Sequence, residues 1–281
     1  MKVAVMTDST AYIPKHLRKK YNIHMVPLSV TFEDETYREE IDITTEEFYE
    51  KMKQSKELPT TSQPSVGHIV SVLEKLSEDY DAVISVHLSS KISGTYQAVV
   101  TAAQMVDSIK VYPYDSEISC MPQGLYAIHA SERAQEGKSP EEIINHLDQL
   151  KENIHAYFIV DDLTNLQRGG RLSHAQALLG SLLKVKPVLH FVDKVIVPFE
   201  KIRTRKKAIQ RVMGMLEEEM KAGNVQTVMF IHANDEQTVN DLRDGFTKKY
   251  PDVEILMSYF GPVIGTHVGE GAIGIGWINK F

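Results

Sequence analysis

The chain has 281 residues, of which 42% are hydrophobic and 25% charged; this is ordinary for a globular protein and long enough for two domains with a shared cleft. Its net charge of −7 argues against broad binding to nucleic acid or acidic lipid surfaces. Cys120 is the only cysteine, which excludes an intrachain disulfide and a Cys-rich metal cluster. No apolar run approaches the roughly 20 residues of a membrane span, and the N-terminal run is too short for a signal peptide. We therefore expect a cytoplasmic protein with no stable membrane insertion.

Strand and helix patterns alternate through the first half of the chain. Strands are predicted at residues 3–6, 24–30, 81–86 and 111–115, with a hairpin-like continuation at 33–37. Helices are predicted at residues 14–19, 66–76, 96–105 and 124–135, and from residues 45 and 140 onward. Capping residues are expected among residues 8–10 for the first of these helices, and at Ser65 and Ser139 for two later ones. The alternation predicts a mainly parallel sheet covered by helices.

The second half contains a further set of strands and helices. Strands are predicted at residues 156–160, 186–191, 195–198, 225–231 and 253–259, and helices at 175–183, 208–220 and 236–250. A glycine-dense segment at residues 261–274 is predicted to be a loop between apolar runs. The fold class is therefore α/β, with an N-terminal α/β domain at residues 1–155 and a C-terminal α/β domain at residues 156–281.

A hydroxyl-rich loop at residues 88–95 lies between a predicted buried strand and a predicted helix. The first N–H groups of a helix lack internal partners and attract anions, and α/β sheets place ligands at this position. We expect Ser93 and its neighbours to hold a small anionic group. The alternative is that Ser93 only caps the helix.

Two other features are suited to the same chemistry: the hydroxyl-rich segment at residues 60–65 and the glycine segment that carries His267. Hydroxyls, helix-terminal amides and an imidazole can bind a carboxylate or phosphate without transforming it. The alternative for His267 is a histidine with a purely local partner. The basic run at residues 203–207 is by default a solvated helix start, although positive charge at a helix N-terminus is locally unfavourable.

Most known catalytic signatures are missing: there is no phosphate loop, nucleophile elbow, dinucleotide fingerprint or zinc-protease motif. A serine hydrolase acting on acyl esters remains an alternative, assembled from Ser93, His267 and Asp8, because such triads are defined by geometry. A regulatory module that binds small anions is a third interpretation.

Five motifs occur together in a characteristic order. They are TDST at residues 7–10, TSQPS at 61–65, SSKISGTYQ at 89–97, RGGR at 168–171 and GPVIGTHVG at 261–269. In this combination the chain resembles the DegV family of bacterial fatty-acid-binding proteins, and the resemblance extends from the first predicted strand to the last.

The resemblance implies a carrier that buries one long-chain fatty acid, palmitate- or oleate-like, in a cleft between two α/β domains. It assigns the carboxylate to Ser93, Thr61 and His267, with further donors at Gly94 and Thr95. No catalytic residue, metal or cofactor is expected in this chain.

In some members of the family a separate fatty-acid kinase phosphorylates the bound carboxylate, and the resemblance assigns Arg203 to the docking of that partner. The chain itself is expected to be a monomer.

The acyl chain needs a closed tunnel. We hypothesise that four leucines on one face of the predicted helix at residues 175–183 line part of it: Leu178, Leu179, Leu182 and Leu183.

Two positions depart from the family pattern. Glu270 replaces a frequent proline and adds a negative charge near the expected headgroup. The segment at residues 120–122 has larger side chains than is usual and is expected to alter the end of the pocket.

Overall fold

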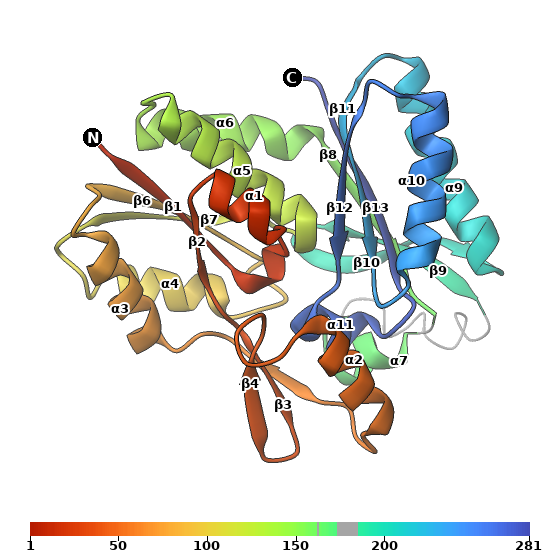
Figure 1. Ribbon diagram of the computed structural model, residues 1–281, viewed down its shortest axis with the longest axis horizontal. Helices are drawn as coiled ribbons and strands as arrows, with labels where there is room; N and C mark the ends of the chain where they lie inside the picture. Colours follow the sequence, from red (N-terminus) through yellow and green to blue (C-terminus); the bar gives the residue numbers. More distant parts are fainter. Residues whose placement is uncertain (162, 173–184) are drawn as a thin grey trace. The chain divides into compact units, whose positions relative to one another are not determined.

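The computed structural model describes residues 1–161, 163–172 and 185–281, which form two compact units (Figure 1). The first unit comprises residues 1–44 and 61–152, and the second comprises residues 45–60 and 153–281. Residues 45–60 therefore cluster with the C-terminal half of the chain, whereas a division into residues 1–155 and 156–281 assigns them to the N-terminal domain. The expected helix at residues 175–183, with its four leucines, lies outside the described residues.

The first unit is built on a parallel sheet with the strand order β2-β1-β6-β7. Its strands are β1 (Val3–Asp8), β2 (Ile23–Val26), β6 (Ala82–His87) and β7 (Lys110–Asp115). Strand β6 is buried along its whole length, as expected for a central strand with helices on both faces. The predicted α/β class and the parallel sheet are confirmed.

Helices cover this sheet, with α3 (Val66–Leu76) and α4 (Thr95–Ala103) on one side and α5 (Cys120–Gln135) and α6 (Pro140–Asn153) on the other (Figure 1). A core of aliphatic side chains joins α3 and α4 to β1 and β6. The remaining α-helix of this unit is the short α1 (Lys15–Lys20).

Two of the predicted helix caps are confirmed. The Ser65 side chain accepts a hydrogen bond from the N–H of His68 at the start of α3. Ser139 and Glu142 form a reciprocal capping box at the start of α6, because each accepts a hydrogen bond from the backbone N–H of the other.

The predicted cap of the first helix is wrong. Asp8 accepts from the N–H of Thr10 and caps a short 3₁₀ helix, η1 (Ser9–Ala11), whereas α1 begins after Pro14 with no side-chain cap. The side chains of residues 8–10 are all buried, so they are part of the interior of the unit and not a solvated turn.

A small sheet with the order β4-β3-β5 extends from the first unit. Its strands are β3 (Ser29–Phe32), β4 (Glu35–Arg38) and β5 (Thr60–Ser62), and β3 and β4 form the predicted hairpin. The strand predicted at residues 24–30 is divided into β2 and β3 around Pro27, which has no N–H to donate to a sheet.

The second unit contains a mixed sheet with the order β10-β9-β8-β13-β11-β12. Its strands are β8 (Ile154–Ile159), β9 (Lys186–Val192), β10 (Val195–Ile202), β11 (Val225–His232), β12 (Glu254–Tyr259) and β13 (Ile273–Asn279). Of the pairings along this sheet, β11 with β12 is parallel and the others are antiparallel. The helices α9 (Arg205–Lys221) and α10 (Glu236–Lys249) share a core with this sheet that includes the fully buried Trp277.

Within the described part of the second unit there are three further helices: α2 (Thr45–Gln54), α7 (Thr164–Arg168) and α11 (Pro262–Val268). The hydroxyl of Tyr49 in α2 donates to the carbonyl of Phe260, just before α11, at 2.8 Å. This contact explains why α2 clusters with the C-terminal half of the chain. None of the described helices has the length and apolar character that a membrane span requires.

Candidate functional site

The hydroxyl-rich loop at residues 88–95 lies at the carboxyl edge of the parallel sheet, between the end of β6 and the start of α4. Its backbone is folded on itself, because the N–H groups of Ile92 and Ser93 both donate to the carbonyl of Ser89, at 3.1 and 3.2 Å. The N–H of Ser89 donates to Ile118, in the loop that follows β7. Loops after two neighbouring strands therefore meet at this edge, which is where parallel sheets bind ligands.

Ser93 is half-buried, and its Oγ lies 2.9 Å from Oγ1 of the buried Thr95. The N-cap of α4 is Gly94 and not Ser93, although the Ser93 hydroxyl accepts the N–H of Thr95 at 3.3 Å. Within the described residues, the N–H groups of Gly94, Tyr96 and Gln97 donate no hydrogen bond. Two hydroxyls and three unbonded amides are thus gathered at one helix start, where the helix dipole favours negative charge.

The segment that carries Thr61 lies against this loop. Oε1 of Gln63 sits so close to Gly94 that a Cβ atom on Gly94 would be 1.9 Å from it. Thr61 itself is half-buried and is the middle residue of β5, an edge strand of the small sheet. The structure therefore brings the segments around residues 61–63 and 93–95 together within the first unit, and Gln63 is a neighbour that the sequence analysis did not single out.

His267 lies in α11, so the prediction of a loop at this position is wrong. Pro262 occupies the first helical position after Gly261, and the helix ends at Gly269, whose φ of 78° is in the left-handed region. Proline at the start and glycine just past the end are the residues that begin and stop helices, so the glycines at residues 261 and 269 delimit a helix. His267 is buried, with 9% of its surface exposed.

The RGGR segment at residues 168–171 is built around His267. A Cβ atom on Gly169 would lie 2.3 Å from Nδ1 of His267, so the backbone approaches the imidazole closely at this nitrogen. Gly170 has a φ of +72°, which side chains rarely adopt. Burial, followed by the charge of Arg171, lowers the pKa of His267 to about 3. A neutral imidazole has one ring N–H to donate, so His267 can offer an anion a hydrogen bond but no positive charge of its own.

The expected ligands of the carboxylate are divided between the units. Thr61, Ser93, Gly94 and Thr95 belong to the first unit and His267 to the second, so their assembly into one site stays a prediction. Arg203 is exposed in the bend between β10 and α9. The leucines expected to line the acyl pocket lie outside the described residues.

The hydrolase alternative loses support from the position of Asp8. Its carboxylate is fully buried and bonded to His87, whose Nδ1 lies 3.0 Å from Asp8 Oδ2. The other ring nitrogen of His87 lies 2.6 Å from Oγ of Ser85. This Ser–His–Asp chain resembles a catalytic triad in its connectivity, but all three side chains are inaccessible to solvent and to any substrate.

The two departures from the family pattern have local partners. Glu270 accepts hydrogen bonds from Lys53 of α2 at 3.1 Å and from Asn234 at 2.7 Å, so its charge is offset within the second unit. Cys120 is buried at the first position of α5, where burial raises the pKa of its thiol and keeps it neutral.

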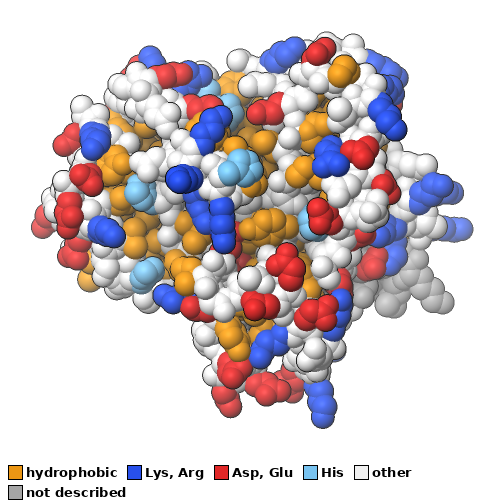
Figure 2. Space-filling view, in the orientation of Figure 1, with side chains coloured by type: hydrophobic (Ala, Val, Ile, Leu, Met, Phe, Trp, Pro, Cys, Tyr) orange, Lys and Arg blue, Asp and Glu red, His pale blue; other side chains and the backbone are white. Residues whose placement is uncertain are grey.

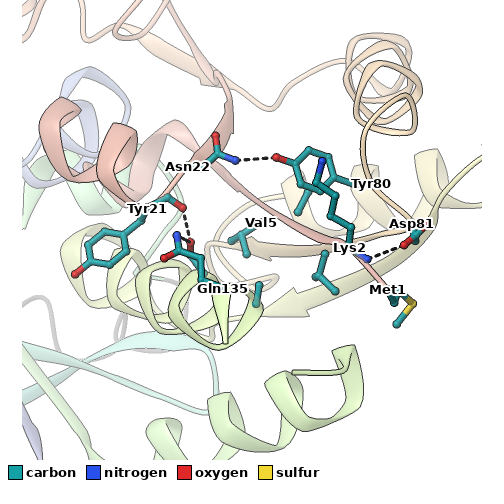
Figure 3. A pocket seen from close by; sticks show the side chains of 12 residues that line it. Met1, Lys2, Val5, Tyr21, Asn22, Tyr80, Asp81 and Gln135 are labelled. Atoms are coloured by element: carbon teal, nitrogen blue, oxygen red, sulfur yellow. Dashed lines mark hydrogen bonds between the residues drawn. The ribbon is translucent and has the colours of Figure 1, made fainter. Parts of the chain in front are cut away.

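An open pocket of about 580 Å³ lies near the amino end of β1 (Figure 3). Its polar groups bind each other: Asn22 donates to Tyr80, and Lys2 N donates to Asp81. We assign no ligand to it. Among the described residues there is also no group of three or more His, Cys, Asp or Glu side chains placed to hold a metal ion. Acidic and basic side chains are both spread over the face in Figure 2.

A parallel sheet with a hydroxyl-rich loop at its carboxyl edge, together with a second unit that holds a buried histidine, defines a two-unit α/β protein whose loop presents hydrogen-bond donors at a helix start. A family model described as "Uncharacterised protein, DegV family" matches residues 2–280. The chain therefore belongs to the DegV family.

Relatives of the chain match it over its whole length. Protein DegV of Bacillus subtilis (strain 168) is 57% identical over 281 residues, covering all of both chains. The solved structure of DegV from Bacillus subtilis, described as a fatty acid binding protein, has a TM-score of 0.95, with 57% identity and full coverage of both chains. The structure described as fatty acid binding of a DegV family protein from Thermus thermophilus has a TM-score of 0.92 at 32% identity, again with full coverage of both chains.

Proposed function

We propose that this protein binds a long-chain fatty acid and holds its carboxylate with the hydroxyls of Ser93 and Thr61, donors at Gly94 and Thr95, and the imidazole of His267. The observation that carries the proposal is the start of α4, where two hydroxyls lie beside the segment of Thr61 together with three N–H groups that donate to none of the described residues. The relatives described as fatty-acid-binding proteins support the same ligand class.

The physical chemistry of the ligand explains why both parts of the proposed site are needed. Burying about fourteen methylene groups at roughly 0.8 kcal/mol each gives about 11 kcal/mol of gross stabilisation. A carboxylate that leaves water loses far more than this unless several donors replace its hydration. A neutral His267 suits this purpose, because it can donate one hydrogen bond without needing a counter-charge when the site is empty.

The experiment that tests the proposal is denaturing extraction of the recombinant protein followed by mass spectrometry. We expect about one long-chain fatty acid per chain, of the palmitate or oleate type. Protein that yields none, and that takes up neither added palmitate nor added oleate, would refute the proposal.

We also propose that the protein acts as a carrier and presents the carboxylate to a separate ATP-dependent fatty-acid kinase, with Arg203 contributing to the docking surface. It would act in the cytoplasm as a monomer. Arg203 is exposed and is the first residue of the basic run that leads into α9, which suits contact with an acidic partner surface.

An Arg203→Ala variant tests this role. The charge is expected to be needed for the encounter with the kinase and not for lipid binding, so acyl-phosphate formation should fall while fatty-acid uptake is unchanged. Lys206→Ala, in the first turn of α9 and three residues further along the chain, is the matched control for the loss of one positive charge. Equal loss of uptake and of phosphorylation in Arg203→Ala would contradict a docking role.

A further inference from the structure

Asp8 is the most heavily bonded buried carboxylate around the loop at residues 88–95. Its Oδ1 accepts the N–H of Thr10 at 3.0 Å and the hydroxyl of Thr10 at 2.6 Å. Its Oδ2 accepts from Nδ1 of His87 and the N–H of Leu88, both at 3.0 Å, and from Nε2 of Gln123 at 3.1 Å. Five donors from three separate parts of the chain therefore converge on one side chain with no exposed surface.

This arrangement connects Asp8 to the proposed carboxylate site through a short series of contacts. Asp8 fixes the N–H of Leu88, the first residue after β6. The next residue, Ser89, accepts the N–H of Ser93 through its carbonyl. Two hydrogen bonds, joined by the peptide bond between Leu88 and Ser89, thus connect the Asp8 carboxylate to Ser93, the residue proposed to hold the ligand.

We propose that Asp8 is a positioning residue for the fatty-acid carboxylate: it fixes the backbone where β6 passes into the loop and so sets the direction of the Ser93 hydroxyl and the N–H groups at the start of α4. This inference rests on the proposed function. It gives a functional reason for the presence of a fully buried carboxylate in this unit.

The charge of Asp8 matters because every group around it donates. An ionised carboxylate is an acceptor at both oxygens, whereas an amide has one accepting and one donating end. In Asp8→Asn the amide NH₂ would face either Thr10 or the group formed by His87, Leu88 and Gln123. One set of donors would lose its acceptor, and the backbone at Leu88 or at Thr10 would have to move.

The test compares palmitate with hexadecanol, which has the same chain length and no carboxylate. In Asp8→Asn we expect the ratio of palmitate affinity to hexadecanol affinity to fall at least tenfold, while hexadecanol affinity stays within about threefold of wild type. Ser131→Ala is the matched control. It removes a buried hydroxyl that donates to the carbonyl of Tyr21, in the pocket near the amino end of β1, and should leave the ratio unchanged.

Each result of this comparison decides a different point. Equal loss of both affinities in Asp8→Asn would mean that Asp8 only stabilises the fold and would overturn the inference. Wild-type protein that binds neither ligand would refute the proposed function, and the inference with it.

If Asp8→Asn does not fold, Gln123→Met replaces it. This variant removes one donor to Asp8 at similar side-chain volume and leaves the carboxylate in place. A fall of about threefold in the ratio is expected, and an unchanged ratio would overturn the inference.

Discussion

The two units present the groups proposed to bind the carboxylate in different ways. In the first unit the donors are hydroxyls and backbone amides on a loop, and the charge that holds the loop, Asp8, is buried behind it. In the second unit the proposed donor is His267, a helical imidazole whose pKa is lowered by burial and, to a smaller extent, by the positive charge of Arg171. In the proposed site, the first arrangement would attract the carboxylate through the geometry of its donors, and the second would add an electropositive surrounding.

The two units also differ in how tightly a glycine in each is packed against its neighbour. Gly94 and Gly169 are both positions where an added Cβ atom would be far inside contact distance of a neighbour, at 1.9 and 2.3 Å. The neighbour of Gly94 is the end of the exposed Gln63 side chain, which can move, whereas the neighbour of Gly169 is the buried ring of His267. The first site is therefore expected to adapt to small changes and the second to resist them.

The largest expected effect is the pH dependence of the second unit. His267 has a folded-state pKa of about 3, against about 6.5 in an unfolded chain. Below pH 6.5 the unfolded chain binds more protons than the folded one, so the free energy of unfolding falls as the pH decreases, until the loss is complete near pH 3. Between pH 7.5 and pH 5 the expected loss from His267 alone is about 2 kcal/mol.

Denaturant unfolding followed by Trp277 fluorescence measures this loss. Trp277 is the only tryptophan in the chain and is buried in the core of the second unit. The difference in stability between pH 7.5 and pH 5 should be smaller in His267→Gln than in wild type. His16→Gln, which removes an exposed histidine of α1, should retain the wild-type difference, and an unchanged difference in His267→Gln would contradict the burial of a neutral imidazole.

The next effect is the cost of a methyl group beside His267. Gly169→Ala should destabilise the second unit by about 1–3 kcal/mol, because neither the buried ring nor the backbone can yield without strain. Gly214→Ala in α9 is the matched control: nothing lies within 4 Å of its added Cβ, and alanine in a helix interior should stabilise by about 0.5–1 kcal/mol. Equal unfolding midpoints for the two variants in urea would mean that the His267 ring has room to move.

A change in the first unit should affect binding more than stability. Ser93→Ala removes a hydroxyl from the start of α4 and is expected to weaken palmitate binding by about 1–3 kcal/mol, with little change in the unfolding midpoint. Isothermal titration of delipidated protein measures the affinity. Unchanged affinity would place the headgroup elsewhere, and wild-type turnover of acyl esters that disappears in Ser93→Ala would favour the hydrolase alternative.

Much of the first unit could be predicted from local sequence signals. Apolar runs alternating with helical patterns predict the parallel sheet, and Ser65 and Ser139 are each followed by the helix that they cap. The same reasoning failed at residues 261–269, where the number of glycines was taken to indicate a loop. The informative signal was their position, because Pro262 and Gly269 mark the start and the end of a helix.

The hydroxyl loops of the candidate site were visible in the sequence, but the residues that support them were not. Asp8 was expected to cap a nearby helix, whereas it binds Leu88 and Gln123, which are 80 and 115 residues away. No local pattern contains such contacts, because they arise only when β1, β6 and α5 are packed together. The requirement for glycine at position 169 could not be predicted for the same reason, because the atom that excludes a side chain there belongs to His267, which is distant in the sequence.

The smallest expected effect lies at Gly94. This residue has a φ of −79°, which alanine adopts readily. Gly94→Ala therefore stabilises the folded state by a few tenths of a kcal/mol or more, because alanine lowers the conformational entropy of the unfolded chain. Against this, the side chain of Gln63 must turn away from the added methyl group. We expect the two contributions to leave the free energy of unfolding within about 0.5 kcal/mol of wild type. The effect of Gln63→Ala on stability, measured once in wild type and once in Gly94→Ala, isolates the clash. If Gln63→Ala stabilises the Gly94→Ala variant more than it stabilises wild type, Gln63 is held more firmly than its exposure indicates. That outcome would remove the contrast with Gly169 and make the loop as rigid as the histidine site.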